Sequence, residues 1–447
     1  MRIDFAFGRN GLPLDLPAPF HYEVLEARSA APLAQPQAAI ESALDSPIGC
    51  RPLVSLAKNK KSAAISVCDI TRPVPNWQIL PPLLRRIETA GIPRDAITIL
   101  IATGLHRPAT DAEIAEICGD FVARNYRVVN HHARELREHR FLGATQSGTP
   151  VYVDERFLAA DLHITVGFIE PHLMLGFSGG RKLIAPGLAA ETTIKVLHSP
   201  KFMRDQRAVE GSIKHNPLHR ELLEIAGMAR HDFMVDVALA RSEGARPRPI
   251  AAVFAGDPVQ AHHCGVQFVS QAMLRVLEDP VDAVITTAAG YPLDLTFYQA
   301  IKGVTAAAHI VKPGGRILLL AACEEGAGGR EFSEMLSRSC SDREFLARIA
   351  GDPVTVDQWQ LEKLALVTTR VEVHYYVPGL PAACHASVWG SVQPSAEEAI
   401  RALLRGLPNE ATVAVIPEGP YVLALPETQE TPGLSAPHSP SRSTRKA

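Results

Sequence analysis

Short apolar runs and amphipathic segments alternate along most of this chain. Uninterrupted apolar runs predict buried strands at Ala63–Val67, Ile97–Ala102 and Leu162–Val166. The amphipathic segment Trp77–Ala90 predicts a helix, and another is expected to open at Thr110, where Glu113 completes a capping box. Strands that are apolar on both faces and separated by helices indicate a parallel sheet that is covered on both sides.

The alternation resumes later in the chain, with predicted strands at Val281–Thr287 and Arg316–Ala321 and a helical pattern at Phe297–Val311 between them. We therefore expect an α/β fold of two α/β domains, each with a largely parallel, helix-covered sheet, and an active site in the cleft between them. The expected domains are residues 1–272 and 273–410. A strand at Thr412–Ile416 is a candidate to return to the first domain.

Two segments near the ends have patterns of their own. In the first sixteen residues, alternating apolar positions on either side of Asn10-Gly11 predict a hairpin. Residues 427–447 are rich in Pro, Ser, Thr and Arg without apolar periodicity, which predicts a disordered tail.

Composition excludes several classes of protein. Lys and Arg total 45 against 48 Asp and Glu, a net charge of −3 that gives no support to nucleic-acid or membrane-surface binding. No apolar run is long enough for a signal peptide or a membrane span, so we expect a cytoplasmic protein. The seven scattered cysteines form no CxxC pair, which fits a reducing compartment and argues against a cysteine zinc site.

Polar loops follow the first two predicted strands. Asp69 and Arg72 lie beside a rigid Pro-Val-Pro sequence, which suits either ligand binding through the Arg fork or an ion pair that braces the loop. His106 follows the second strand in Thr-Gly-Leu-His-Arg-Pro, where it suits general acid–base catalysis or is simply a surface histidine. Ligands bind beyond the carboxyl ends of such strands.

A glycine-rich stretch after Leu162–Val166 carries His172 and then the sequence Ser-Gly-Gly-Arg-Lys, which ends at Lys182. Its glycines would let backbone amides approach an anion. The stretch is not a P-loop, because Arg181 precedes the lysine and a leucine follows it. We expect the adjacent Arg181 charge to lower the pKa of Lys182, which favours a nucleophilic amine; a glycine-rich turn with solvated cations is the alternative.

Two helical segments add candidates. His198 ends the short helical stretch that begins at Glu191, where it is either a metal ligand or a cap. Tyr298 and Lys302 share a helix face at i, i+4, and this face could hold a small carboxylate or belong to a capped helix with an exposed lysine.

Five of these sequences, taken in order, resemble the nickel-pincer lactate racemase family over most of the chain. They are DITRPVP at 69–75, TGLHRP at 103–108, EPH at 170–172, GFSGGRK at 176–182 and YPLDLTFYQAIKG at 291–303. The resemblance implies that residues 1–272 bind a nickel-pincer nucleotide, the pyridinium-3,5-bisthiocarboxylic acid mononucleotide, linked to Lys182. It implies that His198 is the nickel ligand and that His106 and His172 are the acid/base pair.

The resemblance also implies two sets of contacts. The cofactor would be contacted by Asp69, Arg72, Ser178, Gly179 and Gly180. The substrate would be contacted by Arg72, Tyr298, Gln299, Lys302 and Trp359. The implied reaction is racemisation of a lactate-like 2-hydroxy acid by proton-coupled hydride transfer through a transient 2-keto acid, with cofactor-synthesis enzymes as partners.

Three alternatives stay open at this stage. A sugar-acid 2-epimerase is the alternative within the same family. A methyltransferase-like enzyme would bind adenosylmethionine at the turn Pro313–Gly315 and would not need Lys182. A non-catalytic cofactor carrier would need Lys182 and His198 but neither His106 nor His172.

Overall fold

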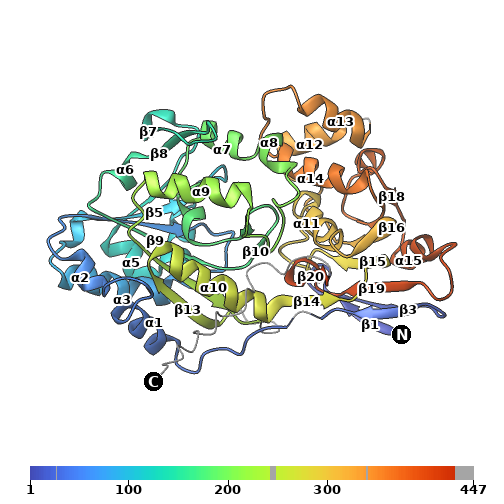
Figure 1. The fold of residues 1–447 in the computed structure, drawn as a ribbon, viewed down its shortest axis with the longest axis horizontal. Coiled ribbons are helices and arrows are strands. Elements are labelled where there is room, and N and C mark those ends of the chain that lie inside the picture. Colours follow the sequence, from blue (N-terminus) through green and yellow to red (C-terminus); the bar gives the residue numbers. More distant parts are fainter. Residues whose placement is uncertain (27, 242–247, 339–340, 428–447) are drawn as a thin grey trace, which may run out of the picture.

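Two lobes lie side by side in the computed structural model, which describes residues 1–26, 28–241, 248–338 and 341–427 (Figure 1). The first lobe is built on a six-stranded sheet. Its strands, in spatial order, are β13 (Ile250–Gly256), β12 (Phe233–Leu239), β9 (Leu162–Phe168), β4 (Ala63–Cys68), β5 (Ile97–Ala102) and β6 (Arg127–Asn130). All neighbours are parallel except β12 and β13.

Helices cover both faces of this first sheet, because its central strands are apolar on both sides. On β4, Ala63 and Ile65 belong to one buried cluster, and Ala64 between them belongs to another on the opposite face. The helices of this lobe are α1 (Pro36–Asp45), α2 (Leu53–Ala57), α3 (Asn76–Thr89), α4 (Asp111–Cys118), α5 (Asp120–Asn125), α6 (Glu155–Leu158), α7 (Glu191–Leu197), α8 (Pro200–Met203), α9 (Pro217–Met228) and α10 (Pro258–Met273). The predicted capping box of Thr110 and Glu113 at the start of α4 is confirmed.

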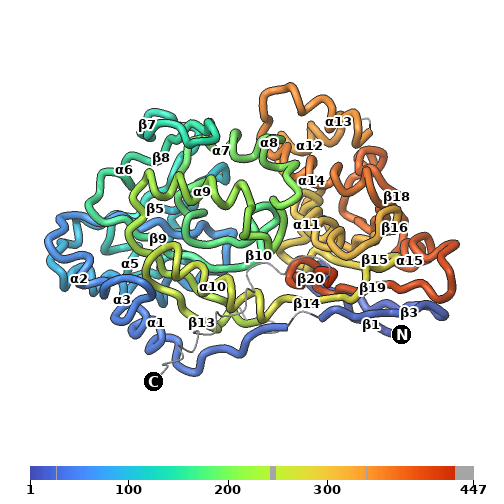
Figure 2. The backbone as a smooth tube through the Cα atoms, in the orientation of Figure 1, coloured from blue at the N-terminus to red at the C-terminus, as the bar shows by residue number. Residues whose placement is uncertain are grey.

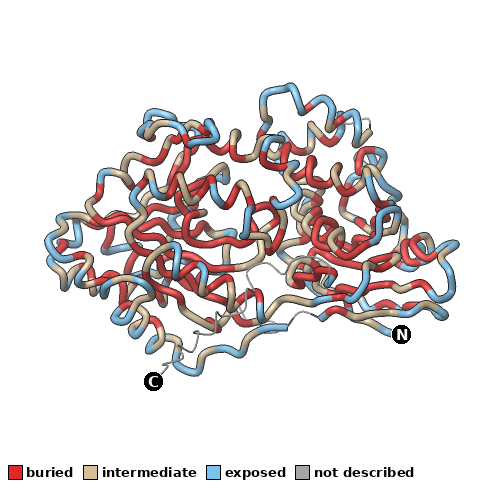
Figure 3. The backbone as a smooth tube through the Cα atoms, in the orientation of Figure 1, coloured by how far each residue is buried: buried red, intermediate tan, exposed pale blue. Residues whose placement is uncertain are grey.

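The second lobe contains a six-stranded sheet in which every neighbour is parallel. Its strands, in order, are β18 (Ser391–Val392), β17 (Glu372–Tyr376), β16 (Val311–Leu320), β15 (Val281–Thr287), β19 (Thr412–Ile416) and β3 (His21–Val24). Its helices are α11 (Phe297–Ala307), α12 (Arg330–Ser337), α13 (Asp342–Ile349), α14 (Gln358–Thr368) and α15 (Ala396–Leu404). Buried backbone follows the strands of both lobes (Figure 3). The predicted α/β fold with parallel, helix-covered sheets is confirmed.

Short ribbons complete the fold. They are β1 (Arg2–Phe5) with β2 (Leu12–Asp15), β7 (His139–Ala144) with β8 (Pro150–Asp154), β10 (Pro171–His172) with β11 (Gly176–Phe177), and β14 (Leu274–Leu277) with β20 (Leu423–Pro426). The β1–β2 ribbon confirms the predicted hairpin, with Phe5 and Leu14 buried.

The expectation that Thr412–Ile416 returns to the first domain is wrong. This strand, β19, pairs with β15 on one side and β3 on the other, both in the second sheet. The hairpin also packs on the second sheet, so the first 25 residues belong to the second lobe and not with the rest of residues 1–272 (Figure 2). An apolar run signals that a strand is buried but carries no information about its partner.

Two further expectations concern the tail at residues 427–447 and the location of the protein. The predicted tail, apart from Glu427, lies outside them. Within the described ranges, no helix is both long and apolar enough to span a lipid bilayer. The cytoplasmic location stays a prediction.

Candidate active site

Loops at the carboxyl ends of β4, β5 and β9 meet helices α11 and α14 of the second lobe. The charge of Arg72, in the loop after β4, acts on four groups from other segments: His172, Lys182, Tyr298 and Lys302. Parallel strands place their carboxyl ends along one edge, which explains why Arg72, His172 and Lys182 converge there. The sequence-predicted residues from both lobes are thus brought together around Arg72.

His106 is held by a carboxylate. Its Nδ1 lies 2.6 Å from Oδ2 of Asp69, whose other oxygen accepts a 2.6 Å hydrogen bond from the Thr71 hydroxyl. Burial raises the pKa of Asp69, but the His106 and Thr71 bonds and the charges of His106 and Arg72 outweigh it and lower this pKa. Asp69 is therefore a carboxylate that fixes the ring of His106, the arrangement that orients a general base.

The Lys182 loop depends on a close approach to Asp236 of β12. Gly179 has φ of +87°, and a Cβ atom there would lie 2.2 Å from Asp236 Oδ2. The Gly180 amide donates a 2.8 Å bond to the same oxygen. The Ser178 hydroxyl donates to the carbonyl of Phe168 at 2.8 Å. These contacts lie within the fold, and the predicted cofactor contacts of Ser178, Gly179 and Gly180 stay a prediction.

Arg181 and Lys182 are adjacent in sequence but differ in surroundings. The Arg181 guanidinium is buried and bonds to the carbonyls of Leu175 and Phe177 and to His262. Burial lowers the pKa of Lys182 well below its usual value, and the leading charge contribution in the same direction comes from Arg72. Arg181, which we expected to lower this pKa, is not among the principal causes. Its guanidinium binds the two carbonyls and His262 instead. The predicted direction is confirmed and the predicted cause is wrong.

His172 lies among the cations of the site. Burial lowers its pKa well below the usual value, and the charges of Lys182, Lys302 and Arg72 add to the effect. At neutral pH its imidazole is therefore uncharged and able to accept a proton. The Met174 amide donates toward its Nδ1 at a long 3.5 Å.

His198 follows α7 as its C-cap. Its Nδ1 lies 2.8 Å from the carbonyl of Ile194. A carbonyl only accepts, so Nδ1 carries the proton and Nε2 keeps its lone pair. Burial lowers the pKa of His198 to about 4. A neutral imidazole of fixed tautomer has the chemistry of a metal ligand.

An aromatic pair lines this histidine. The Trp359 ring, at the start of α14, lies 4.3 Å from the His198 ring, centroid to centroid. Its indole N–H donates to the Tyr298 hydroxyl at 3.2 Å. Burial raises the pKa of Tyr298, which therefore stays protonated. Trp359 thus joins the predicted metal ligand of one lobe to the substrate-side helix of the other.

Two α11 side chains could contact an anionic ligand. Oε1 of Gln299 is buried and has no hydrogen-bond partner among the described residues. Burial lowers the pKa of Lys302 to about 8, and the charge of Arg72 acts in the same direction. Arg72 and Lys302 together present a positive region that suits an anionic ligand.

Sequence reasoning missed Asp357, Glu170 and Glu210. Burial raises the pKa of Asp357, while its hydrogen bond to Tyr298 and the charge of His106 act in the opposite direction. Asp357 therefore interacts with residues of both lobes. Glu170 belongs to the EPH motif at 170–172 but was not predicted as a site residue, yet its charge acts to raise the pKa of both Lys182 and Lys302. Glu210 has no local pattern that could have marked it. No pattern along the chain predicts Asp357 either, because its partners lie 59 and more residues away.

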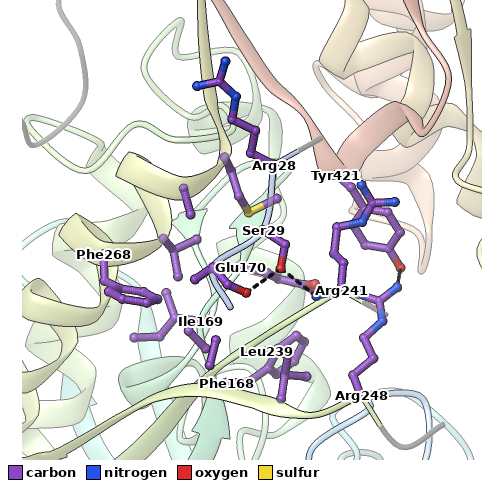
Figure 4. Close-up of a pocket in the computed structure, with 16 residues that line it drawn as sticks. Arg28, Ser29, Phe168, Ile169, Glu170, Leu239, Arg241, Arg248, Phe268 and Tyr421 are labelled. Carbon is purple, nitrogen blue, oxygen red and sulfur yellow. Dashed lines mark hydrogen bonds between the residues drawn. The ribbon is translucent and has the colours of Figure 1, made fainter. Parts of the chain in front are cut away.

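Glu170 also lines a separate cavity of about 550 Å³, including its mouth (Figure 4). Its floor is apolar, and three arginines and Tyr421 surround it. Arg248 donates to the Tyr421 hydroxyl at 2.5 Å, and Arg241 pairs with Glu418. It lacks both histidines of the predicted acid/base pair. Among the described residues, no group of three or more His, Cys, Asp or Glu could hold a metal ion.

Comparisons with known proteins match both lobes. The family model for the lactate racemase N-terminal domain matches residues 7–211, and that for the lactate racemase C-terminal domain matches residues 276–424. A lactate racemase of Lactiplantibacillus plantarum is 37% identical over 344 residues, 76% of this chain and 78% of that protein. A lactate racemase of Thermoanaerobacterium thermosaccharolyticum is 32% identical over 94% of this chain and 98% of its own length.

Solved structures agree. The lactate racemase apoprotein from Thermoanaerobacterium thermosaccharolyticum superimposes with a TM-score of 0.88 at 32% identity and covers 95% of this chain and 100% of that one. A protein from Thermotoga maritima, at 16% identity, has a TM-score of 0.66 over 89% of this chain and all of its own, which shows the fold alone.

Proposed function

The chain belongs to the lactate racemase family, and we propose that it inverts C2 of a 2-hydroxy acid with a nickel-pincer nucleotide linked to Lys182. Its relatives support an isomerase that acts on a 2-hydroxy acid. The observation that carries the proposal is the convergence on Arg72: His172 and Lys182 from one lobe meet Lys302 from the other.

The residues present fit the proposed cofactor. Burial and neighbouring cations disfavour the charged form of Lys182, and an uncharged amine is the form that can join a carboxyl or thiocarboxyl group. The tautomer of His198 leaves Nε2 with a lone pair for a nickel ion. When bound, the cofactor would supply an electrophile that accepts hydride from C2, so that a 2-hydroxy acid could pass through a 2-keto acid.

The protein's own residues would bind the substrate and move its hydroxyl proton. Arg72 and Lys302 would hold the carboxylate by charge-assisted hydrogen bonds. The uncharged His172 would take the hydroxyl proton for one enantiomer. His106, whose imidazolium Asp69 would stabilise, would do the same for the other. Trp359 would limit water beside His198.

No specific observation favours the sugar-acid epimerase over a racemase. The methyltransferase alternative loses its support, because Pro313–Gly315 lies near the amino end of β16, whereas ligands in such sheets bind at carboxyl ends. A non-catalytic carrier would not use the Asp69–His106 pair, and the activity assay separates it from an enzyme.

The test is intact mass with nickel analysis on protein produced together with the cofactor-synthesis enzymes, which are its expected partners. We expect a mass adduct and about one nickel per chain, as one His198 site requires. Both should be lost in Lys182→Ala. The matched control is Lys195→Ala, because Lys195 pairs with Glu191 on α7 at 2.8 Å and should keep the adduct.

Loaded protein is then given single enantiomers of lactate and of larger 2-hydroxy acids, and chiral chromatography follows the mirror image. Conversion of one enantiomer into an equal mixture supports the proposal. An adduct without conversion of any 2-hydroxy acid would favour the carrier. No adduct, with a control racemase loaded in parallel, would contradict the cofactor assignment.

A further inference from the structure

The segment that leads from α8 back to the Lys182 loop crosses to the second lobe. It begins at Met203, where α8 ends, and the amide of Gly211 donates to the carbonyl of Gly176 at 2.9 Å. Between these points it contacts both helices that carry substrate-side residues, α11 and α14. We refer to Met203–Gly211 as the crossing segment.

Glu210 binds the face of α11 that carries Lys302. Its Oε1 accepts a 2.9 Å hydrogen bond from the Thr305 hydroxyl, and its Oε2 lies 2.9 Å from Nε2 of His309. Thr305 lies one turn after Lys302, and its hydroxyl is 3.0 Å from the Lys302 carbonyl. Glu210 is 8% exposed. A buried carboxylate is therefore fixed directly behind the turn of Lys302.

Glu210 is charged in this position. Burial raises its pKa, but the bond and charge of His309, together with the Thr305 bond, outweigh burial and lower it. Its negative charge acts on Lys302 of α11 and Lys363 of α14. An ionised carboxylate in the low-dielectric interior destabilises the fold unless its partners compensate the loss of hydration. We therefore look for a role of the buried Glu210 charge.

A second, independent set of contacts attaches the crossing segment to α14. The Lys363 ammonium donates to the carbonyls of Met203 and Ala208 at 2.9 and 2.7 Å. Glu362 is fully buried and accepts from Arg204 Nε at 2.7 Å. Glu362 is not among the principal charges on Lys302, although it belongs to the same segment-to-helix contact.

The charged groups that face Lys302 come from several elements. Arg72 follows β4, while Glu170, His172 and Lys182 follow β9. Glu210 adds a negative charge from the crossing segment. Arg72 and burial oppose the charged form of Lys302, and the carboxylates favour it. Glu170 also acts on Lys182. Glu210, by contrast, is bonded to Thr305 on the Lys302 helix and to His309 just after it.

We propose that Glu210 is a positioning residue for substrate binding: bonded to Thr305 and His309, it fixes this turn of α11 and places a buried negative charge behind Lys302, the group that would bind the substrate carboxylate. The inference rests on the proposed function, because it takes Lys302 as the group that binds this carboxylate. It adds a residue outside every motif of the sequence.

The test is the pH dependence of ligand binding in Glu210→Gln. The probe is 2-hydroxyisobutyrate, which has the carboxylate and hydroxyl but no hydrogen at C2 and so cannot react. Its dissociation constant is measured by calorimetry on loaded full-length protein from pH 6 to pH 9. Loss of the Glu210 charge should lower the Lys302 pKa from about 8, so binding should weaken several-fold at pH 8.5, where fewer Lys302 side chains stay charged, and little at pH 6.

Glu362→Gln is the matched control, because it removes a buried carboxylate of the same segment-to-helix contact that does not act on Lys302. It should keep the wild-type pH midpoint. Glu210→Asp should restore much of it, because the charge returns. The proposal would be overturned if Glu210→Gln weakened ligand binding equally at every pH, or if Glu362→Gln shifted the pH midpoint by the same amount. Either result would indicate that loss of a buried carboxylate simply destabilises the contact between the crossing segment and the helices.

A second readout does not depend on the substrate. Competitive acetylation of lysine amines followed by peptide mass spectrometry reports the pKa of Lys302 directly. A lower value in Glu210→Gln than in wild type supports the positioning role even if no 2-hydroxy acid is racemised, which would count against the proposed function alone. An unchanged value would overturn the inference while leaving racemisation intact. If Glu210→Gln does not fold, Glu210→Ala is measured instead, because it also removes the charge, and an unchanged Lys302 pKa there would overturn the inference.

Discussion

The two lobes supply their site residues in different ways. The first lobe uses irregular loops, where Gly179 approaches Asp236 too closely for any side chain and His106 depends on Asp69. The second lobe uses regular helices, where Tyr298 and Lys302 occupy neighbouring turns of α11. The loop groups each depend on one close contact with a carboxylate, and the helix groups are positioned by the regular spacing of α11.

This difference predicts unequal sensitivity. A loop held by one close contact has few ways to relax, so a single added atom displaces its reactive groups. A helix face shares its packing over many neighbours and tolerates small changes. We therefore expect substitutions in the first lobe to have large effects on reaction and stability, and conservative substitutions in the second to have small ones.

The largest effect is expected from His172→Ala in the first lobe. Loss of a proton acceptor should lower kcat for at least one enantiomer by about 10³-fold or more. Kinetics of both enantiomers on loaded protein measure this, and intact mass must show that the Lys182 adduct is retained. If the adduct is lost, the residue serves the cofactor and not proton transfer.

Acid should destabilise the first lobe before the second. Burial lowers the pKa of seven described histidines there and of one, His374, in the second lobe. The seven are His131, His139, His172, His198, His219, His231 and His262. Their folded pKa values lie below the unfolded value of about 6.5, so their contribution is complete above it and falls as pH decreases below it, by about 1.4 kcal/mol per pH unit for each proton taken up on unfolding.

Hydrogen exchange at pH 7.0 and pH 5.5 measures this by lobe, in a range above most carboxylate titrations. Asp236 acts in the opposite direction, because burial raises its pKa to about 7 and its protonation in acid is favourable in the folded state. One carboxyl group is outnumbered by seven histidines. Equal loss of protection in both lobes would contradict the expected order.

Gly179→Ala should destabilise the folded protein by about 2–4 kcal/mol, because the residue has φ of +87° and its Cβ would lie 2.2 Å from Asp236 Oδ2. Gly227→Ala is the control, since a Cβ there would meet nothing within 4 Å inside α9. That change should stabilise by about 0.5–1 kcal/mol. Denaturant unfolding of both variants measures the difference, and equal free energies of unfolding would disprove the close-contact argument.

The smallest effect is expected from Trp359→Phe in the second lobe. The smaller ring keeps most of the packing on His198 but loses the N–H donor to Tyr298. We expect a fall in kcat/KM of about two- to fivefold, in line with one neutral hydrogen bond. A loss comparable to that of His172→Ala would show that the helix side is as sensitive as the loop side.

The sequence predicted elements better than their partners. The runs that became β5 and β15 were located to the residue, because a buried strand leaves a local apolar pattern. The pairing of β19 was misassigned, because a partner more than a hundred residues away leaves no such pattern. For the same reason, the cation that lowers the pKa of Lys182 was predicted to be the adjacent Arg181, whereas the leading charge contribution comes from the distant Arg72.

The site was predicted unevenly as well. Residues within motifs, such as His106 and Lys302, could be singled out because their residue types carry recognisable chemistry. Glu210 and Asp357 could not, since their roles arise from contacts with distant helices. Sequence therefore predicted candidate reactive groups, and three-dimensional contacts were needed to find the groups that hold them.

Strand β3 has a consequence for how the chain folds during synthesis. Val24 of β3 pairs with Val415 of β19, so about 390 residues separate the partners. At ribosomal rates of about 5–20 residues per second, roughly 20–80 s pass before β19 is made. The first lobe can complete its sheet in that interval, while the first strand of the second sheet waits with its edge unpaired. Nascent chains of this protein should therefore depend on chaperones at their amino end, ahead of the first folded lobe.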